Sequence, residues 1–195
     1  MAGTALVFDL DGTAWDSYPA YAAALSDGGA TSVSERLAEL KAGASVVSLA
    51  RRHGGETRFI RRLIESTDGP RPYPGTIETL DVLRAQKRPL GVVTSLPGRL
   101  AAPLLRMTGL AKYFDVVIDR TNCRVAKPSP QPLRLALQGL GCEQDTAYYV
   151  GDSEVDGACA EAASVPFAWA SYGYGTTTPR GSSVVLTAFV DVLKL

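Results

Sequence analysis

The sequence predicts an α/β fold, a doubly wound and mostly parallel sheet with a helical segment inserted after the first strand. Short apolar runs recur along the chain, amphipathic helical patterns separate them, and one stretch near the N-terminus breaks this alternation. Strands that alternate with helices form parallel sheets, because each crossover helix packs back onto the sheet. The 195 residues, 46% of them apolar, are enough to bury the core of one domain that carries an insertion.

Each apolar run is predicted to be a strand that is buried on both faces. The runs lack the alternation of polar and apolar residues that a half-exposed strand would show. They cover residues 5–10, 90–95, 116–118, 146–150 and 165–170. We therefore expect a core of five or six mostly parallel strands.

Helices are expected between these runs, where apolar residues recur on one helical face. One pattern has the spacing i, i+4, i+7 and consists of Leu100, Leu104 and Met107. Another has the spacing i, i+3, i+4, i+7 and consists of Leu133, Ala136, Leu137 and Leu140. Both are expected to be crossover helices.

The inserted segment is predicted to span residues 15–72 and to form a helical cap without a convincing strand. Its helical patterns include Phe59, Ile60, Leu63 and Ile64. Prolines at both edges bias the chain away from helix, so the two links are expected to lie side by side as a hinge. Residues 1–14 and 73–195 would then form the core.

Composition excludes several classes of partner. Twenty basic residues balance twenty acidic ones, so we expect no nucleic acid and no membrane surface as partner. The three cysteines show neither a disulfide framework nor metal-ligand spacing, and the N-terminus has no long apolar run. We expect a cytoplasmic monomer or homodimer, with the choice between the two left open.

Reactive side chains follow the predicted strands one after another. Asp9 and Asp11 end the first strand, Thr94 and Ser95 end the second, and Asp152 follows the fourth. Parallel sheets place ligands at the carboxyl ends of their strands, so these side chains are expected to meet. Two acids at i, i+2 in an extended strand project to one side, which concentrates negative charge and implies a cation.

A hard cation fits the acidic residues, since Asp152 and Asp156 bring further oxygen ligands to this place. Oxygen donors without a cluster of Cys or His suit Mg²⁺, which binds through few carboxylates and keeps waters and substrate phosphate. Lys127, Thr94 and Ser95 are expected to hold the transferring phosphoryl group of a small phosphorylated metabolite.

The same residues suggest a two-step reaction. Asp9 would attack phosphorus while protonated Asp11 gives its proton to the leaving alkoxide. Asp11 would then deprotonate the water that cleaves the acylphosphate. The cation would offset the repulsion between an aspartate and a phosphate dianion.

These residues, in this order, resemble the haloacid dehalogenase superfamily, specifically its phosphoglycolate phosphatase-like branch with a helical cap after the first motif. The matching pieces are residues 9–13, 92–95, 127–130 and 151–156. The resemblance implies that Mg²⁺ is held by the Asp9 carboxylate, the Asp11 backbone carbonyl and Asp152, while Asp156 supports metal-bound waters. It also implies a phosphatase, because dehalogenases of the superfamily lack an acid at the position of Asp11.

Three other functions are alternatives to a phosphatase. A phosphomutase of the β-phosphoglucomutase type would return the phosphoryl group to a sugar. A receiver-type signalling domain would lack the large insertion. A non-catalytic relative that senses phosphate or binds a partner would have lost a catalytic acid. This sequence keeps all four acids of the predicted site, which are Asp9, Asp11, Asp152 and Asp156.

The insertion also holds Arg51, Arg52, Arg58, Arg61 and Arg62 in one stretch. They are suited to bind a second anionic group of the substrate, but a solvated helix face is favoured because acidic residues nearly balance the basic ones across the insertion. His53, the only histidine, is expected to have a capping or solvent-exposed role and not a catalytic one, since the proposed reaction needs no imidazole.

Overall fold

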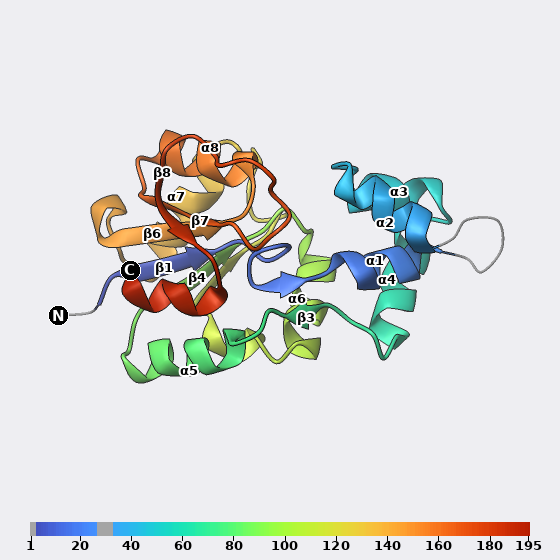
Figure 1. Ribbon diagram of the computed structural model, residues 1–195, viewed down its shortest axis with the longest axis horizontal. Coiled ribbons are helices and arrows are strands. Elements are labelled where there is room, and N and C mark those ends of the chain that lie inside the picture. Colours follow the sequence, from blue (N-terminus) through green and yellow to red (C-terminus); the bar gives the residue numbers. More distant parts are fainter. Residues whose placement is uncertain (1–2, 27–32) are drawn as a thin grey trace.

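The computed structural model describes residues 3–26 and 33–195, and its centre is a six-stranded sheet in the order β5-β4-β1-β6-β7-β8 (Figure 1). Every pair of neighbouring strands in this sheet is parallel. The chain order reverses at β1, which lies between β4 on one side and β6 on the other. The strands are β1 (Ala5–Phe8), β4 (Leu90–Val93), β5 (Val116–Ile118), β6 (Ala147–Gly151), β7 (Phe167–Ala170) and β8 (Ser182–Leu186).

Alternate residues of β1 enter two separate hydrophobic cores. Leu6 and Phe8 pack into the larger core, while Ala5 and Val7 pack into the smaller one. This division follows from the period of two in a strand. Both layers are needed to bury a strand with no polar face, as the sequence predicted.

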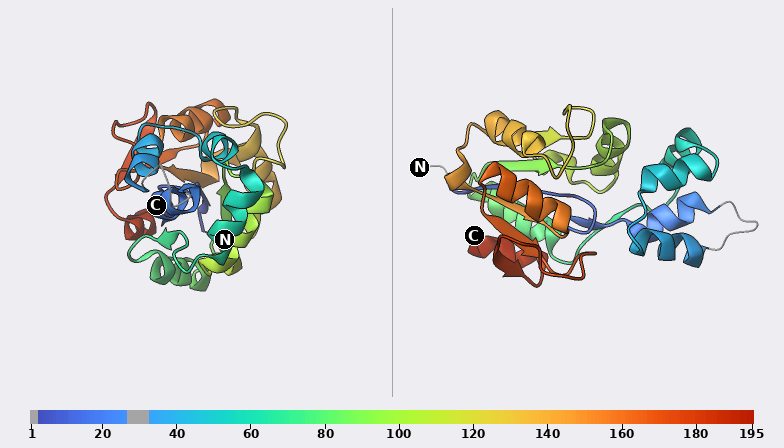
Figure 2. Two further views of the ribbon diagram at one scale, coloured as in Figure 1. Left: turned by 90° about the vertical axis from the view of Figure 1, so that its right-hand side faces the viewer. Right: turned by 90° about the horizontal axis from the view of Figure 1, so that it is seen from above.

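Helices cover both faces of the sheet (Figure 2). The helices α7 and α8 pack on the face of Ala5 and Val7, and α5, α6 and η3 lie on the other. Both predicted crossover helices are present, one as α6 and one as α7. The helices of the core are α5 (Thr76–Ala85), α6 (Gly98–Met107), η1 (Ala111–Tyr113), α7 (Gln131–Leu140), η2 (Gln144–Thr146), α8 (Glu154–Ala163) and η3 (Phe189–Lys194).

The inserted helices stand beyond one end of the sheet, joined to it by two chain segments (Figures 1 and 2). These segments pair as two short antiparallel strands, β2 (Trp15–Asp16) and β3 (Arg71–Pro72). The helices of the insertion are α1 (Tyr18–Leu25), α2 (Val33–Lys41), α3 (Val46–Arg52) and α4 (Glu56–Glu65).

Two sequence-based expectations differ from the structure. The insertion was expected to hold no strand, whereas its edges form β2 and β3. Two-residue strands leave no detectable period in a sequence. The sequence predicts no strand at β8 either, because the positions of β8 alternate between part-exposed and exposed until Leu186 and form no buried apolar run. Its place at the sheet edge explains this exposure.

No helix within residues 3–26 and 33–195 combines the length and the apolar character that crossing a membrane requires.

Candidate active site

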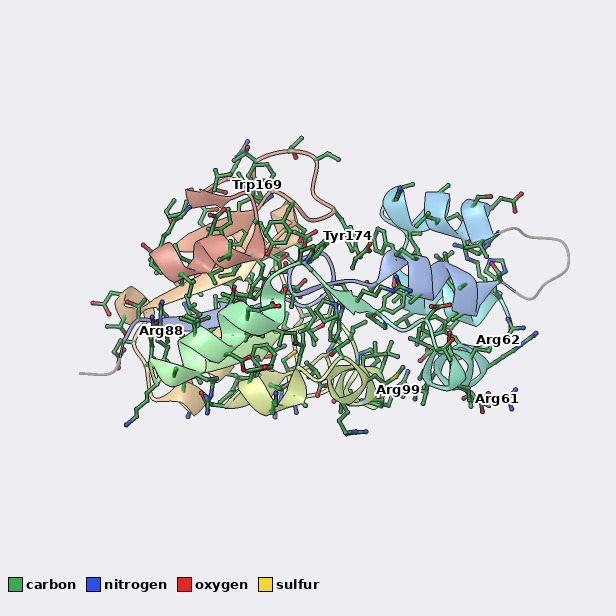
Figure 3. The ribbon with its side chains drawn as sticks, turned by 60° about the horizontal axis from the view of Figure 1, so that its bottom comes forward. Arg61, Arg62, Arg88, Arg99, Trp169 and Tyr174 are labelled. Atoms are coloured by element: carbon green, nitrogen blue, oxygen red, sulfur yellow. The ribbon has the colours of Figure 1, made fainter. Side chains whose placement is uncertain are left out.

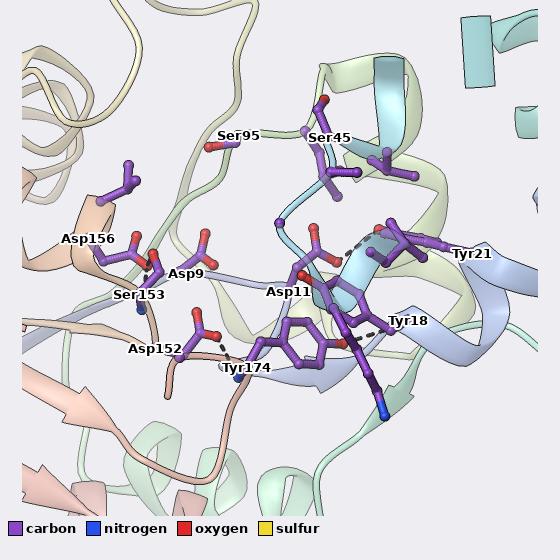
Figure 4. A pocket seen from close by; sticks show the side chains of 18 of the residues that line it. Asp9, Asp11, Tyr18, Tyr21, Ser45, Ser95, Asp152, Ser153, Asp156 and Tyr174 are labelled. Carbon is purple, nitrogen blue, oxygen red and sulfur yellow. Dashed lines mark hydrogen bonds between the residues drawn. The ribbon is translucent and has the colours of Figure 1, made fainter. Parts of the chain in front are cut away.

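Three carboxylates converge at the carboxyl ends of β1 and β6 (Figure 4). Asp9 directly follows β1, and its backbone N–H continues the ladder by donating to the Val150 carbonyl oxygen at 2.8 Å. Asp152 directly follows β6, and Asp156 lies in the first turn of α8. Their ligand oxygens lie within 4.8 Å of one another, and all three residues are buried. The switch in strand order at β1 creates this meeting point.

Lys127 supplies the cation of this cluster. Its Nζ atom donates to Asp9 Oδ1 at 2.8 Å and to Asp156 Oδ1 at 2.7 Å, and its side chain is 5% exposed. Tyr149 Oη lies 3.1 Å from the same Nζ and donates to Asp156 Oδ1 at 2.8 Å. The ammonium and one phenol therefore fix two of the three acids.

The acids outnumber the ammonium, so the cluster would carry a net charge of −2 if all three were ionised. Burial raises the pKa of Asp9 well above its ordinary range, although Lys127 opposes this rise. Burial and the neighbouring Asp156 raise the pKa of Asp152 to about 7. Burial acts on Asp156 in the same sense, but Lys127 and the hydrogen bonds from Ser153 and Tyr149 together outweigh it and lower the pKa of Asp156.

This imbalance fits a divalent cation. All three acids offer hard oxygen donors, which suit Mg²⁺. A cation of charge +2 would neutralise the cluster and favour the ionised forms that burial disfavours.

Asp11 lines the same cavity as the three acids and is hydrogen-bonded by residues of the insertion. Its Oδ1 accepts hydrogen bonds from Trp15 Nε1 at 2.8 Å and from Tyr21 Oη at 2.9 Å. Burial raises the pKa of Asp11, and these hydrogen bonds oppose the rise. Asp9 and Asp11 nevertheless line the same cavity, although the strand ends at Phe8.

Asp11 lies in a tight turn after β1. The backbone N–H groups of Thr13, Ala14 and Trp15 all donate to the Leu10 carbonyl oxygen. Gly12 has a φ of +83°, and a Cβ there would lie 2.3 Å from Asp152 Oδ2. Only glycine fits this conformation and this close approach.

Thr94 and Ser95 lie where β4 ends, as the sequence predicted. Thr94 is buried and its Oγ1 accepts a hydrogen bond from the Leu96 N–H at 3.1 Å, which leaves its own proton free to donate. Ser95 is exposed and lines the cavity described next.

A cavity of about 530 Å³ lies between the acid cluster and the inserted helices. The core contributes the acids, Lys127 and Ser95 to its wall, and the insertion contributes Tyr18, Tyr21 and part of the segment 40–47. Lys41, at the end of α2, is exposed, and it and Lys127 are the cations that line the cavity within the described part of the chain. The cavity therefore has a charged floor and one cation on its opposite wall.

The arginine stretch does not reach this cavity, because none of its five members lines it. Arg51 and Arg99 of α6 pair with Glu56, and Arg62 donates to the carbonyl oxygens of Ala24 and Ser26. His53 is the C-cap residue of α3, which agrees with the capping role predicted for it.

Sequence reasoning missed three residues of the site. Tyr149, Ser153 and Tyr174 each bond an acid of the cluster, and Tyr174 does so through its backbone N–H, 2.7 Å from Asp152 Oδ2. A tyrosine in an otherwise apolar strand needs a partner for its hydroxyl, so Tyr149 carried a signal. The Tyr174 N–H is a backbone donor, and a backbone donor leaves no signal in the residue types of a sequence.

The model of the family described as haloacid dehalogenase-like hydrolase matches residues 6–170, so this chain belongs to that family. A phosphoglycolate phosphatase of Yersinia pseudotuberculosis is 33% identical over 210 residues, which cover 96% of this chain and 90% of the relative. The phosphoglycolate phosphatase of Escherichia coli is 36% identical over 125 residues, which cover 61% of this chain and 50% of that relative. The predicted class of enzyme, a phosphoric monoester hydrolase, is thereby confirmed.

Solved structures share the fold. A candidate phosphoglycolate phosphatase from Lactobacillus plantarum gives a TM-score of 0.79 at 23% identity and covers 100% of this chain and 99% of its own. CbbY from Rhodobacter sphaeroides, solved in complex with xylulose-1,5-bisphosphate, gives a TM-score of 0.73 at 20% identity, with 96% and 95% coverage. The predicted fold class is confirmed.

Proposed function

We propose that this protein is a Mg²⁺-dependent phosphatase that hydrolyses a small phosphate monoester through a phosphoaspartate on Asp9. The observation that carries the proposal is the buried cluster of Asp9, Asp152, Asp156 and Lys127 at the floor of a cavity. Asp9, Asp152 and the Asp11 carbonyl would hold the metal, with Asp156 behind them. When bound, Mg²⁺ supplies charge neutralisation for the phosphoryl group.

Asp9 is the proposed nucleophile because its carboxylate lies at the cavity floor and is oriented by Lys127. The same ammonium is placed to meet the oxygens of a phosphoryl group on Asp9. Thr94 Oγ1 and Ser95 are proposed to donate to these oxygens.

Asp11 is the proposed acid and base. It also lines the cavity, and its raised pKa favours the protonated form that the first step needs. After the alkoxide has taken this proton, Asp11 can accept one from the attacking water. The hydrogen bonds from Trp15 and Tyr21 hold its carboxyl group in place throughout.

The substrate is proposed to carry a second anionic group, as phosphoglycolate does. Lys41 lines the part of the cavity wall that the insertion contributes, and no hydrogen bond or ion pair engages its ammonium in the described part of the chain. A short substrate that spans the cavity would place its distal carboxylate at this ammonium. The helical segment that carries Lys41 is proposed to act as a cap, with residues 15–72 as its bounds.

The test is phosphate release from a panel of metabolites, run with Mg²⁺ and with EDTA. We expect turnover that requires Mg²⁺ and is lost in Asp9→Asn. Lys41→Met should raise KM about tenfold for phosphoglycolate but not for ethyl phosphate, which has no second anion. Lys112→Met, a change at an exposed lysine outside the cavity, is the control. Turnover in EDTA, or an active Asp9→Asn, would contradict the mechanism.

A further inference from the structure

The segment Tyr172–Gly175 joins the acid cluster to the place where the chain leaves the core for the insertion. It follows β7, and Figure 3 shows Tyr174 where the core meets the inserted helices. Its two tyrosines are Tyr172 and Tyr174. No step of the proposed reaction uses them.

On the core side, this segment holds Asp152. The Tyr174 N–H donates to Asp152 Oδ2 at 2.7 Å, and Trp169 Nε1 donates to the Asp152 carbonyl oxygen at 3.0 Å. A Cβ at Gly173 would lie 2.4 Å from Asp152 Cβ, and one at Gly175 would lie 2.0 Å from the Asp152 carbonyl oxygen. The two glycines therefore let the backbone approach Asp152 closely enough to bond its carboxylate.

On the insertion side, the hydroxyl of Tyr174 holds the first residues beyond β2. It accepts hydrogen bonds from the N–H groups of Ser17 at 2.7 Å and Tyr18 at 3.1 Å, and it donates to Asp16 Oδ1 at 2.8 Å. The rings of Tyr174 and Tyr18 stack with centroids 3.6 Å apart and planes 13° apart. Figure 4 shows the two rings next to each other and the Tyr174 backbone nitrogen bonded to Asp152.

One side chain and its own amide thus connect Asp152 with the start of α1. We propose that Tyr174 is a positioning residue that couples metal binding at Asp152 to the orientation of the inserted helices. The proposal rests on the proposed function, since it takes Asp152 as a metal ligand. Coupling between two sites is reciprocal, so Mg²⁺ should steady the start of α1, and a displaced α1 should weaken Mg²⁺ binding.

The variant Tyr174→Phe separates the two halves of this link. It removes the hydroxyl that bonds residues 16–18, and it keeps the ring and the backbone N–H that bonds Asp152. Tyr113→Phe is the matched control, because Tyr113 is a buried core tyrosine whose hydroxyl donates to Asp81 Oδ1 at 2.8 Å, outside the cavity lining.

Two measurements on the full chain test the coupling, with Mg²⁺ alone as the probe. Titration calorimetry gives the Mg²⁺ affinity, and hydrogen exchange with mass spectrometry follows the peptide 15–25. In the wild type and in Tyr113→Phe, Mg²⁺ should slow exchange in this peptide at least about fivefold. In Tyr174→Phe, Mg²⁺ should still bind, with exchange in the peptide slowed less than about twofold.

The outcomes separate this inference from the proposed function. If the wild type binds Mg²⁺ and Tyr174→Phe shows the same slowing as the wild type, the coupling is wrong and the phosphatase proposal stands. The coupling is also wrong, and the phosphatase proposal also stands, if the wild type binds Mg²⁺ but hydrogen exchange in its peptide 15–25 is not slowed. If the wild type does not bind Mg²⁺, both the metal assignment and the coupling are wrong.

Discussion

Replacing Lys127 by methionine would leave the most heavily charged part of the core without its cation. Methionine keeps a similar length and removes the ammonium, which donates to Asp9, Asp156 and, at 3.4 Å, the Val93 carbonyl oxygen. Removing one partner of a buried ion pair typically costs about 3–5 kcal/mol, because the remaining charge is unpaired. At about 2–4 °C per kcal/mol for a chain of this size, Tm should fall by roughly 6–20 °C.

The loss of stability in Lys127→Met should grow as the pH rises. In the wild type, Lys127 lowers the pKa of Asp156, so ionised Asp156 stabilises the fold at every pH above 3.8, the ordinary pKa of an aspartate. This stabilisation is lost only when the pH falls below 3.8. Without Lys127, burial raises the pKa of the same carboxyl group, so the variant loses stability as the pH rises above 3.8. The difference in Tm between the two proteins should therefore be larger at pH 7 than at pH 4.5.

Thermal unfolding in EDTA at these two pH values measures both effects. Lys112→Met removes an exposed lysine and should change stability by less than about 0.5 kcal/mol. A Lys127→Met variant as stable as this control would refute the reasoning. So would a difference that is larger at pH 4.5 than at pH 7.

Three further predictions concern the acids and the insertion. Burial raises the pKa of Asp152 to about 7, so the metal-free protein should lose on the order of 4 kcal/mol of folding stability as the pH rises from 3.8 to 7. Mg²⁺ should therefore raise Tm more at pH 7.5 than at pH 5, and an equal rise in Tm at both pH values would contradict this. Tyr21→Phe removes a hydrogen bond that lowers the pKa of Asp11. In the plot of kcat against pH, the limb assigned to Asp11 should therefore move up by roughly 0.5–1 pH unit. An unmoved limb would count against that assignment. Arg61→Ala should change KM less than about twofold, since Arg61 is exposed and absent from the cavity lining, and a larger rise would restore a substrate-binding role.

The fold was largely predictable because burial on both faces leaves a strong signal. Strands such as β1 and β4 are buried at every position, and the helices between the strands repeat at 3.6 residues. The strands β2, β3 and β8 escaped notice for physical reasons. The first two are too short to show a period, and β8 is an edge strand with exposed positions.

The site was predictable where its residues end strands and unpredictable where backbone geometry decides. The meeting of Asp9 with Asp152 follows from parallel strands, so it could be expected from the sequence. The hydrogen bonds of Asp11 to Trp15 and Tyr21 depend on the turn at Gly12, and the bond to Asp152 depends on the Tyr174 amide. Neither a turn direction nor an amide contact across the chain leaves a pattern in residue types.

The pairing of β2 with β3 has a consequence for how such a protein can change over time. The Tyr73 N–H donates to the Ala14 carbonyl oxygen at 3.3 Å, so the two ends of the core chain meet in space although 58 residues separate them. Segments of very different length can be spliced between these ends without straining the sheet. Selection can therefore change the inserted wall that contacts the substrate while the catalytic residues keep their framework. Substrate choice and catalytic chemistry can then evolve independently.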